Sequence, residues 1–318
     1  CGPFKFLAWE KNKQIVLVAN EDYYQGRPYV DSLILKTKSY TPKESYNQFL
    51  NKEIDLTNVS KYMHDEFEKK NNKKISRPEL SIFGLGFNMK MFPFNITKVR
   101  QAIYYAIPND SITGNQLHSD IPAKSILPSF MSKYIGQSEY KKYDIEKAKK
   151  LLSEAGFKDG KGIGTLELWT PNTQIPDKII ENLKNMGLKV SHKTANWDRF
   201  VNILDGKKAA MFTFTWVADY PGPPAFYSNL LSSSGSDNYF NFKSKLVDSL
   251  LSSTHRIQNF SILKEIFQRI ETVVSDSVPF VPILHRVNNF VVQSYVMNMN
   301  INSYGLAAIK LNKVWLNK

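Results

Sequence analysis

The stretch that decides the fold lies at residues 211–227 and reads MFTFTWVADYPGPPAFY. Its first six residues, 211–216, are aromatic, β-branched or otherwise apolar and carry no charge. An unbroken apolar run of this kind predicts a strand that is buried on both faces. The Pro-Gly-Pro-Pro sequence at 221–224 predicts that regular structure stops there.

A single carboxylate, Asp219, stands between the predicted strand and the proline-rich segment. It is flanked by Trp216 and Tyr220, and a charged group with aromatic neighbours at the mouth of a buried strand is typical of a ligand site. An aspartate before a proline-rich turn also serves as a turn former. The local sequence does not decide between a ligand site and a turn former at Asp219.

Strands and helices alternate upstream of this stretch, which predicts an α/β lobe with a partly parallel sheet. Helix 42–50 has Thr41 as its expected cap with Glu44 three residues on. Strands are expected at 32–38, 54–56, 80–88, 165–170, 188–192, 280–283 and 289–293, after a hairpin at 1–20. Helices are expected at 98–107, 144–155, 177–186, 197–204, 245–252 and 262–274, a surface helix or loop at 61–74, and a tail at 304–315.

Composition indicates a folded chain large enough for two lobes. The 318 residues are 42% hydrophobic and 13% aromatic. The formal charge of +13 would permit an anionic partner, but the lysines are scattered among Asn and Glu with no arginine-rich block. A solvated, lysine-rich surface is the preferred explanation, and no nucleic-acid partner is expected.

The reactive side chains argue against an enzyme or a metal protein. The one cysteine, Cys1, excludes an internal disulfide and a cysteine-rich metal site. The five histidines never fall at metal-ligand spacing, and neither Gly-x-Ser-x-Gly nor His-Glu-x-x-His occurs. We therefore expect no catalytic residues, no metal and no cofactor. The sequence also has no apolar run of the length that spans a bilayer.

Six short motifs occur in order along nearly the whole chain. They are GPFKF (2–6) with VAN (18–20), NKEID (51–55), FN (87–88) with PFN (93–95) and VRQAI (99–103), YD (143–144) with AKKLLSEAG (148–156), WVADY (216–220), and DSVPFVP (276–282). Together these motifs resemble those of the family 5 extracellular solute-binding proteins, the peptide-binding receptors of ABC importers. The match of WVADY is closest to the oligopeptide-binding branch.

The resemblance implies an α/β fold of the periplasmic-binding-protein type (type II, cluster C) with two lobes. It implies that the family's N-terminal segment and inserted small lobe are lacking here. Residues 1–85 and 286–318 would then be the remaining part of lobe I, and residues 86–285 would be lobe III. The expected function is capture of short peptides in the interlobe cleft and delivery to the permease subunits of an ABC transporter. Alternatives are a non-peptide ligand of the same family (a nickel chelate, haem or a sugar) and a surface interaction or adhesin domain.

The resemblance also assigns site residues. Asp219 corresponds to the aspartate that pairs with the ligand's N-terminus, inside a motif that includes Tyr220. Trp216 and Trp197 correspond to tryptophans that line side-chain pockets; ordinary core packing is the alternative for both.

Two positions depart from the best-known branch. Thr213 stands where that branch has an arginine that helps to hold the C-terminus of short peptides. Arg286 stands where it has a ligand-contacting tyrosine, and we hypothesise that Arg286 supplies the cation for the peptide carboxylate; a salt bridge is the alternative. The adjacent His285 could tune charge near neutral pH or be a structural histidine between strands.

The expected location is outside the cytoplasm, in the periplasm or lipid-anchored at the cell surface. An N-terminal cysteine carries the lipid in bacterial lipoproteins, which is one interpretation of Cys1. The other interpretation is that Cys1 is an arbitrary boundary of the sequence, unrelated to lipidation. The resemblance favours this second interpretation, because the lipid-bearing cysteine of the family precedes the segment that is lacking.

Overall fold

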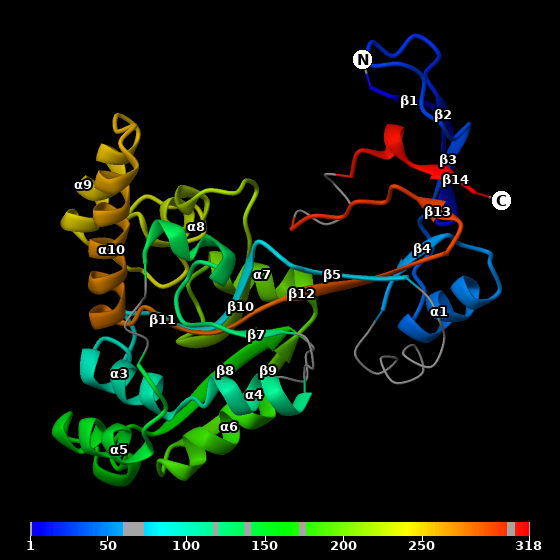
Figure 1. Ribbon diagram of the computed structural model, residues 1–318. Coiled ribbons are helices and arrows are strands. Elements are labelled where there is room, and N and C mark those ends of the chain that lie inside the picture. Colours follow the sequence, from blue (N-terminus) through cyan, green and yellow to red (C-terminus); the bar gives the residue numbers. More distant parts are fainter. Residues whose placement is uncertain are drawn as a thin grey trace. The chain divides into compact units, whose positions relative to one another are not determined.

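A computed structural model describes residues 2–59, 73–116, 120–136, 141–171, 176–303 and 309–317. The chain divides into two compact units, Cys1–Glu79 with Val287–Lys318, and Leu80–Arg286 (Figure 1). The family resemblance implies divisions after residues 85 and 285. Strand β6 (Ser81–Phe87) lies instead in the second unit, because it pairs there with β10 (Met211–Val217) and β11 (Phe280–His285). Most of the predicted element at 61–74 and part of the tail at 304–315 lie outside the described residues.

The first unit contains two antiparallel three-stranded sheets, with orders β1-β2-β3 and β4-β12-β5. The first sheet confirms the hairpin at 1–20, and in the second a late strand returns between two early ones. Thr41 caps helix α1, and its side chain accepts from the backbone N–H of Glu44, as predicted. The elements are β1 (Phe4–Glu10), β2 (Gln14–Ala19), β3 (Ser32–Lys36), α1 (Pro42–Leu50), β4 (Leu56–Asn58), β5 (Lys73–Pro78), β12 (Val287–Val292) and the pair β13 (Val296–Met297) and β14 (Trp315–Leu316).

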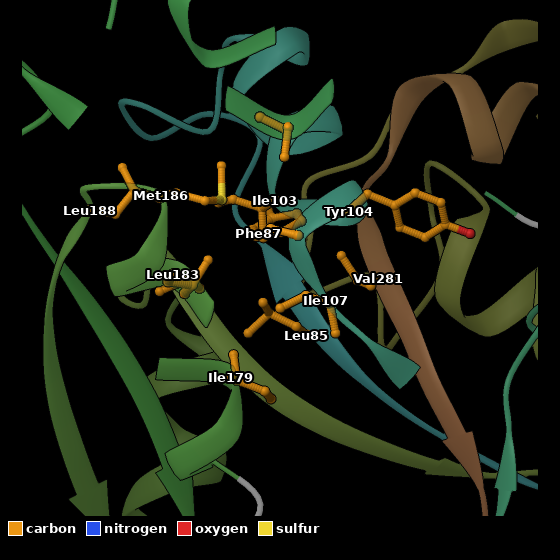
Figure 2. Close-up of a cluster of buried hydrophobic side chains, with 14 of the residues drawn as sticks. Leu85, Phe87, Ile103, Tyr104, Ile107, Ile179, Leu183, Met186, Leu188 and Val281 are labelled. Atoms are coloured by element: carbon orange, nitrogen blue, oxygen red, sulfur yellow. The ribbon is translucent and has the colours of Figure 1, made fainter. Parts of the chain in front are cut away.

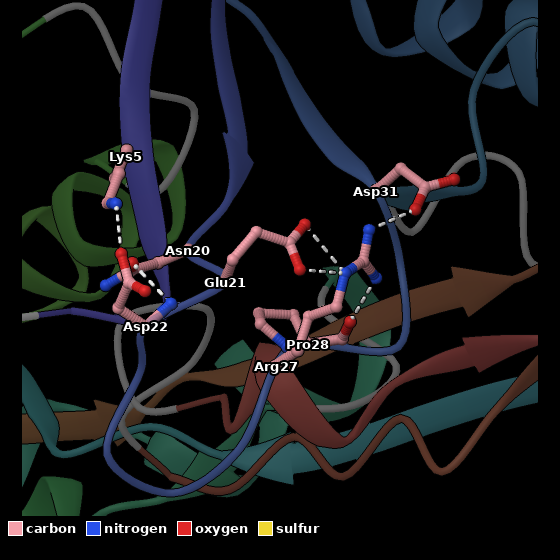
Figure 3. Close-up of polar contacts among 7 residues, drawn as sticks. All are labelled: Lys5, Asn20, Glu21, Asp22, Arg27, Pro28 and Asp31. Atoms are coloured by element: carbon pink, nitrogen blue, oxygen red, sulfur yellow. Dashed lines mark hydrogen bonds and ion pairs between the residues drawn. The ribbon is translucent and has the colours of Figure 1, made fainter.

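Arg27 organises the turn between β2 and β3, as Figure 3 shows. Its Nε lies 2.9 Å from both carboxylate oxygens of Glu21, and its other nitrogens donate to Asp31 and to the Pro28 carbonyl. These ion pairs are exposed, so they fix the course of the turn more than they stabilise the protein.

One face of the β1-β2-β3 sheet is entirely apolar. The pairing of Phe6 with Leu17 and of Ile15 with Leu35 brings the apolar side chains of three strands to one side. Phe6 is 66% exposed and Trp9 64% exposed. An uncovered apolar face of this kind is typical of a contact surface.

The second unit is built around a mixed six-stranded sheet with the order β7-β11-β6-β10-β8-β9. The predicted strand at 211–216 is its β10, which lies inside the sheet between β6 and β8. The remaining strands are β7 (Ile121–Pro122), β8 (Thr165–Pro171) and β9 (Lys189–Ala195). The predicted α/β lobe with a partly parallel sheet is confirmed.

A hydrophobic cluster fills one side of this sheet (Figure 2). Leu85 and Phe87 of β6 contribute to this cluster. They are joined there by Ile103 and Ile107 from α3 and the residue after it, and by Leu183 from α6. The helices of this unit are α3 (Thr97–Ala106), α4 (Asn109–Gln116), α5 (Ile145–Glu154), α6 (Pro176–Asn185), α7 (Trp197–Asp205), α8 (Pro223–Leu231), α9 (Lys245–Thr254) and α10 (Phe260–Ser277), with short 3₁₀ turns at Ser129–Tyr134 and Lys158–Gly160.

Phenylalanine rings cover the other side of the central strands. Phe214 and Phe280 each lie near Phe240, with ring centroids 5.1 and 5.0 Å from it. Gly84 and Gly86 alternate with Leu85 on β6 and leave room for these rings. The glycines that interrupt the predicted strand are therefore packing positions.

The prediction that regular structure stops at 221–224 is wrong in part. Helix α8 begins at Pro223, directly after Gly222, so two prolines occupy its first turn. Proline is tolerated there because the first N–H groups of a helix have no partner within it.

Candidate functional site

Four strands of the second unit end at the same edge of its sheet. β10 is parallel to β8, and β8 is parallel to β9. β6 is antiparallel to both β10 and β11, so β11 runs in the same direction as β10. The carboxyl ends of β8, β9, β10 and β11 therefore meet at one edge, which we call the carboxyl edge. Ligands of open α/β sheets bind at this kind of edge.

Asp219 and Tyr220 follow β10 at the carboxyl edge. Val217 is paired with Ser81, and the N–H of Ala218 donates to the Leu80 carbonyl at 2.8 Å. These bonds hold the chain to β6 up to Ala218, after which Asp219 and Tyr220 are exposed. The carboxylate therefore stands in solvent directly beyond a rigid strand.

Trp216 ties this edge to helix α8. Its indole Nε1 donates to the carbonyl of Ala225 at 2.9 Å, within the first turns of the helix. The ring is half-buried. Trp216 is thus oriented by a hydrogen bond and retains an accessible surface near the end of β10.

Trp197 lies at the same edge, after β9. Asn196 caps α7 by accepting from the N–H of Arg199, and Trp197 is the first residue of that helix. The indole is 61% exposed and its ring centroid lies 6.3 Å from that of Phe200. It is therefore a surface aromatic, unlike the buried tryptophan of the core-packing alternative.

Arg286 is the residue after β11, so it also follows a strand that ends at the carboxyl edge, and it is exposed. His285 beside it is buried, with Nδ1 at 2.8 Å from the Ser81 carbonyl oxygen. Burial lowers the pKa of His285 to about 4, against the smaller opposing effect of backbone hydrogen bonds. The ring is neutral at neutral pH, which favours the structural interpretation of this histidine.

Thr213 lies apart from the other five predicted residues. It is paired with Leu85 in the middle of β10 and is 1% exposed. Its hydroxyl finds no hydrogen-bond partner among the described residues. The side chain of Thr213 thus faces the core and does not reach the carboxyl edge.

Sequence reasoning missed two residues of this edge. Val217 is an exposed apolar residue next to Trp216. The hydroxyl of Ser81 is buried and has no partner in the described part of the chain. The one sequence signal for Ser81 was its place at the start of a predicted strand, which does not reveal the strand's neighbours.

The described ranges contain no group of three or more His, Cys, Asp or Glu side chains that could hold a metal ion. None of the helices in these ranges is long and apolar enough to cross a membrane. The predicted site residues at the carboxyl edge are the carboxylate of Asp219, the guanidinium of Arg286 and the aromatic side chains of Trp197, Trp216 and Tyr220.

Residues 1–238 match the family described as "Bacterial extracellular solute-binding proteins, family 5 Middle". The chain belongs to this family. Family 5 is a family of solute-binding proteins of transport systems, not of enzymes.

Two curated relatives of this family 5 protein have names that give different ligands. Haem-binding protein A of Haemophilus influenzae is 27% identical, and the match covers 90% of this chain and 54% of that protein. The periplasmic oligopeptide-binding protein OppA of Salmonella typhimurium is also 27% identical, over 93% of this chain and 56% of that protein. The family 5 chain thus spans about half the length of the curated relatives it matches.

The solved structures confirm the fold. The oligopeptide-binding protein AppA of Bacillus subtilis, in complex with a nonapeptide, matches with a TM-score of 0.82 and 25% identity over 100% of this chain and 66% of that one. The substrate-binding protein CtaP of Listeria monocytogenes matches with a TM-score of 0.88 and 21% identity over 100% of this chain and 67% of that one. The periplasmic-binding-protein-like fold expected for this family 5 chain is therefore confirmed.

Proposed function

We propose that this chain is the ligand-binding part of a receptor for an ABC importer, and that it holds short peptides at the carboxyl edge of the second unit. The observation that carries the proposal is an exposed carboxylate, Asp219, directly beyond β10, whose side toward β8 pairs with no described strand after Phe212. A free peptide offers both complementary groups, an α-ammonium and an extended backbone. Membership of family 5 and the relatives named as peptide-binding proteins support the same assignment.

The second half of strand β10 has one side that pairs with no described strand. It pairs with β6 over its whole length, but with β8 only at Met211 and Phe212. Because the N–H of Ala218 bonds to β6, alternation directs the backbone groups of Thr215 and Val217 to the opposite side. No strand among the described residues pairs with that side beyond Phe212. An extended peptide could add there as a further strand, which recognises backbone and not sequence.

The charged groups give the bound peptide a direction. The ammonium would pair with Asp219, a charge-assisted contact that strengthens as water is excluded. Arg286 would receive the terminal carboxylate of a peptide of suitable length. Trp216, Tyr220 and Trp197 would provide apolar surfaces for side chains of varied shape.

A non-peptide ligand is the second candidate. It is favoured by relatives of similar identity whose names give haem or deoxycholate as ligand. These ligands have no α-ammonium, so they would not need Asp219. The contribution of Asp219 to binding therefore separates the two candidates.

We also propose, from membership of family 5, how the two units correspond to lobes, how binding is signalled and where it takes place. The first unit would be the remaining part of lobe I and the second unit lobe III. The chain crosses between the units after Glu79 and after Arg286, and a hinge movement about these crossings would signal the bound state to the permease. Binding would take place outside the cytoplasm. Cys1, the candidate for a lipid anchor, lies outside the described residues.

Replacing Asp219 by asparagine in the complete protein is expected to weaken binding of trialanine at least about tenfold, because the ammonium loses its counter-charge. Binding of N-acetyl-trialanine, which has no ammonium, should be weak and unchanged by the substitution. Isothermal titration calorimetry measures both. The control is Asp205→Asn, another exposed acid of the second unit. An equal loss of affinity for both peptides would show that Asp219 does not pair with the peptide ammonium.

A further inference from the structure

The loop that carries Asp219 is held at both of its ends. At its start, the N–H of Ala218 donates to the Leu80 carbonyl at 2.8 Å, which keeps the chain on β6. At its far end, the carbonyl of Ala225 accepts from the indole Nε1 of Trp216 at 2.9 Å. This second bond joins residues nine positions apart in the sequence and closes the loop into a ring.

Helix α8 contributes little of its own to fixing the far end of the loop. Its N-cap, Gly222, has no side chain, and its first two residues are prolines without a backbone N–H. The N–H of Gly222 donates to the Tyr220 carbonyl, and the N–H of Ala225 donates to the Gly222 carbonyl, both at 3.0 Å. These bonds form local turns and do not reach β10. Among the described residues, only the Trp216 indole makes a side-chain hydrogen bond from β10 to this end of the loop.

The carboxylate of Asp219 has no partner of its own that would orient it. In the described part of the chain it makes no hydrogen bond and no ion pair, and the residue is exposed. The backbone of the loop therefore sets where the carboxylate stands. The middle of the loop is closely packed, since a Cβ added to Gly222 would lie 3.3 Å from Tyr220 Cε2.

We propose that Trp216 is a positioning residue for Asp219, whose indole N–H fixes the loop so that the carboxylate is held ready for a cationic group of the ligand. This role rests on the function proposed above, and it makes Trp216 the residue that sets the preference for a free over a blocked peptide N-terminus. A charged contact contributes most when its partner need not be ordered on binding, because ordering costs conformational entropy. Without the indole N–H the loop would have more conformations, and the ammonium would meet Asp219 in only some of them.

The competing role of Trp216 is that of a pocket wall, and the two roles predict different losses of affinity. A wall supplies apolar surface, so its loss weakens every ligand that places a side chain against it, whatever the terminus of that ligand. A positioning residue acts through the Asp219 carboxylate, so its loss weakens only ligands that carry an ammonium. The hydrogen on Nε1, and not the ring, is the group that separates the two roles.

The test replaces Trp216 in the complete protein by benzothienylalanine, which keeps the shape of the ring and exchanges the N–H for sulfur. Isothermal titration calorimetry is expected to show about fivefold weaker binding of trialanine, the effect of one lost hydrogen bond. Binding of N-acetyl-trialanine should not change. In the Asp219→Asn background the same replacement should not weaken trialanine binding further, because the carboxylate through which it acts is gone.

Hydrogen exchange of the ligand-free protein gives a second readout. The analogue at position 216 should speed exchange at the N–H groups of Gly222 and Ala225, while the N–H of Ala218 stays protected by its bond to β6. The matched control is the same replacement at Trp169 of β8, a half-buried tryptophan whose indole makes no hydrogen bond in the described ranges. It should change neither the exchange of the loop nor the ratio of affinities for the two peptides.

Equal losses of affinity for trialanine and N-acetyl-trialanine would overturn the positioning role and assign Trp216 to a pocket wall. Trialanine binding that does not change in the analogue would overturn it as well, and so would unchanged exchange at Gly222 and Ala225. Trialanine binding that is unaffected by Asp219→Asn alone is a different result. It would remove the ammonium contact of the proposed function, and the positioning role with it.

Discussion

Replacement of Arg100 by alanine is expected to destabilise the protein by about 4 kcal/mol, because a buried charged donor with several acceptors would be lost. Arg100 is 2% exposed, and its guanidinium has no carboxylate among its hydrogen-bond partners in the described part of the chain. It donates instead to the carbonyls of Phe94, Ser277 and Val278 and to the hydroxyl of Thr97.

The end of helix α10 explains how this charge is tolerated. Ser277 is the last residue of the helix, and Val278 caps it in the left-handed conformation with φ 47°. The negative end of the helix dipole and its unpaired carbonyls thus face the guanidinium. Burial lowers the pKa of Arg100 to about 10, so the group remains charged at neutral pH. Alanine would leave three carbonyls without this donor and open a cavity.

Urea denaturation followed by tryptophan fluorescence measures this loss. The control is Lys98→Ala on the same helix, whose ion pair with Glu154 is exposed and should change stability by less than about 1 kcal/mol. Arg100→Lys, which keeps the charge but has fewer donors, should fall between the two. An Arg100→Ala protein as stable as the Lys98→Ala protein would show that the buried guanidinium does not hold the end of α10.

Replacement of Gly86 by alanine is expected to cost about 3 kcal/mol through overpacking. A Cβ at this position would lie 2.6 Å from Phe212 Cε2 and 2.7 Å from Phe240 Cε1. Both rings are buried and stacked, with centroids 5.8 Å apart, so neither can withdraw without disturbing the other. Thermal and urea denaturation measure the effect.

A second substitution distinguishes crowding from a general defect of β6. Phe240→Leu removes atoms that the new methyl group would meet, so the double variant should be more stable than the sum of the single effects predicts. Gly2→Ala serves as the control, because its added Cβ would meet only ordinary contacts. Strict additivity of Gly86→Ala and Phe240→Leu would contradict the packing explanation.

Local sequence predicted individual helices and strands where a single signal, such as an apolar run or a helix cap, was strong. The apolar run before Val217 predicted β10, and Asp144 caps α5 as expected by accepting from the N–H of Lys147. Helix α4 (Asn109–Gln116) escaped prediction because its sequence, NDSITGNQ, has no apolar stripe. Helix α8 escaped because its prolines signal a turn as readily as a first helical turn.

The site depended on pairing that local sequence does not encode. Trp197, Asp219 and Arg286 share an edge because β9, β10 and β11 run in the same direction. The insertion of β6 between β10 and β11 joins segments more than a hundred residues apart, and no local pattern predicts it. The burial of Thr213 agrees with the predicted burial of residues 211–216 on both faces, whereas its place among the site residues came from the family resemblance. The predicted site residues came from the family resemblance and not from periodicity.

The most direct test of peptide binding at Asp219 is native mass spectrometry of the complete protein, purified from cells without added ligand. We expect a family of bound masses that fragment as short peptides and that are absent from an Asp219→Ala preparation but present in Asp205→Ala. Bound haem, a bile acid or a metal chelate in place of peptides would contradict this function, as would peptides that remain bound after Asp219 is removed.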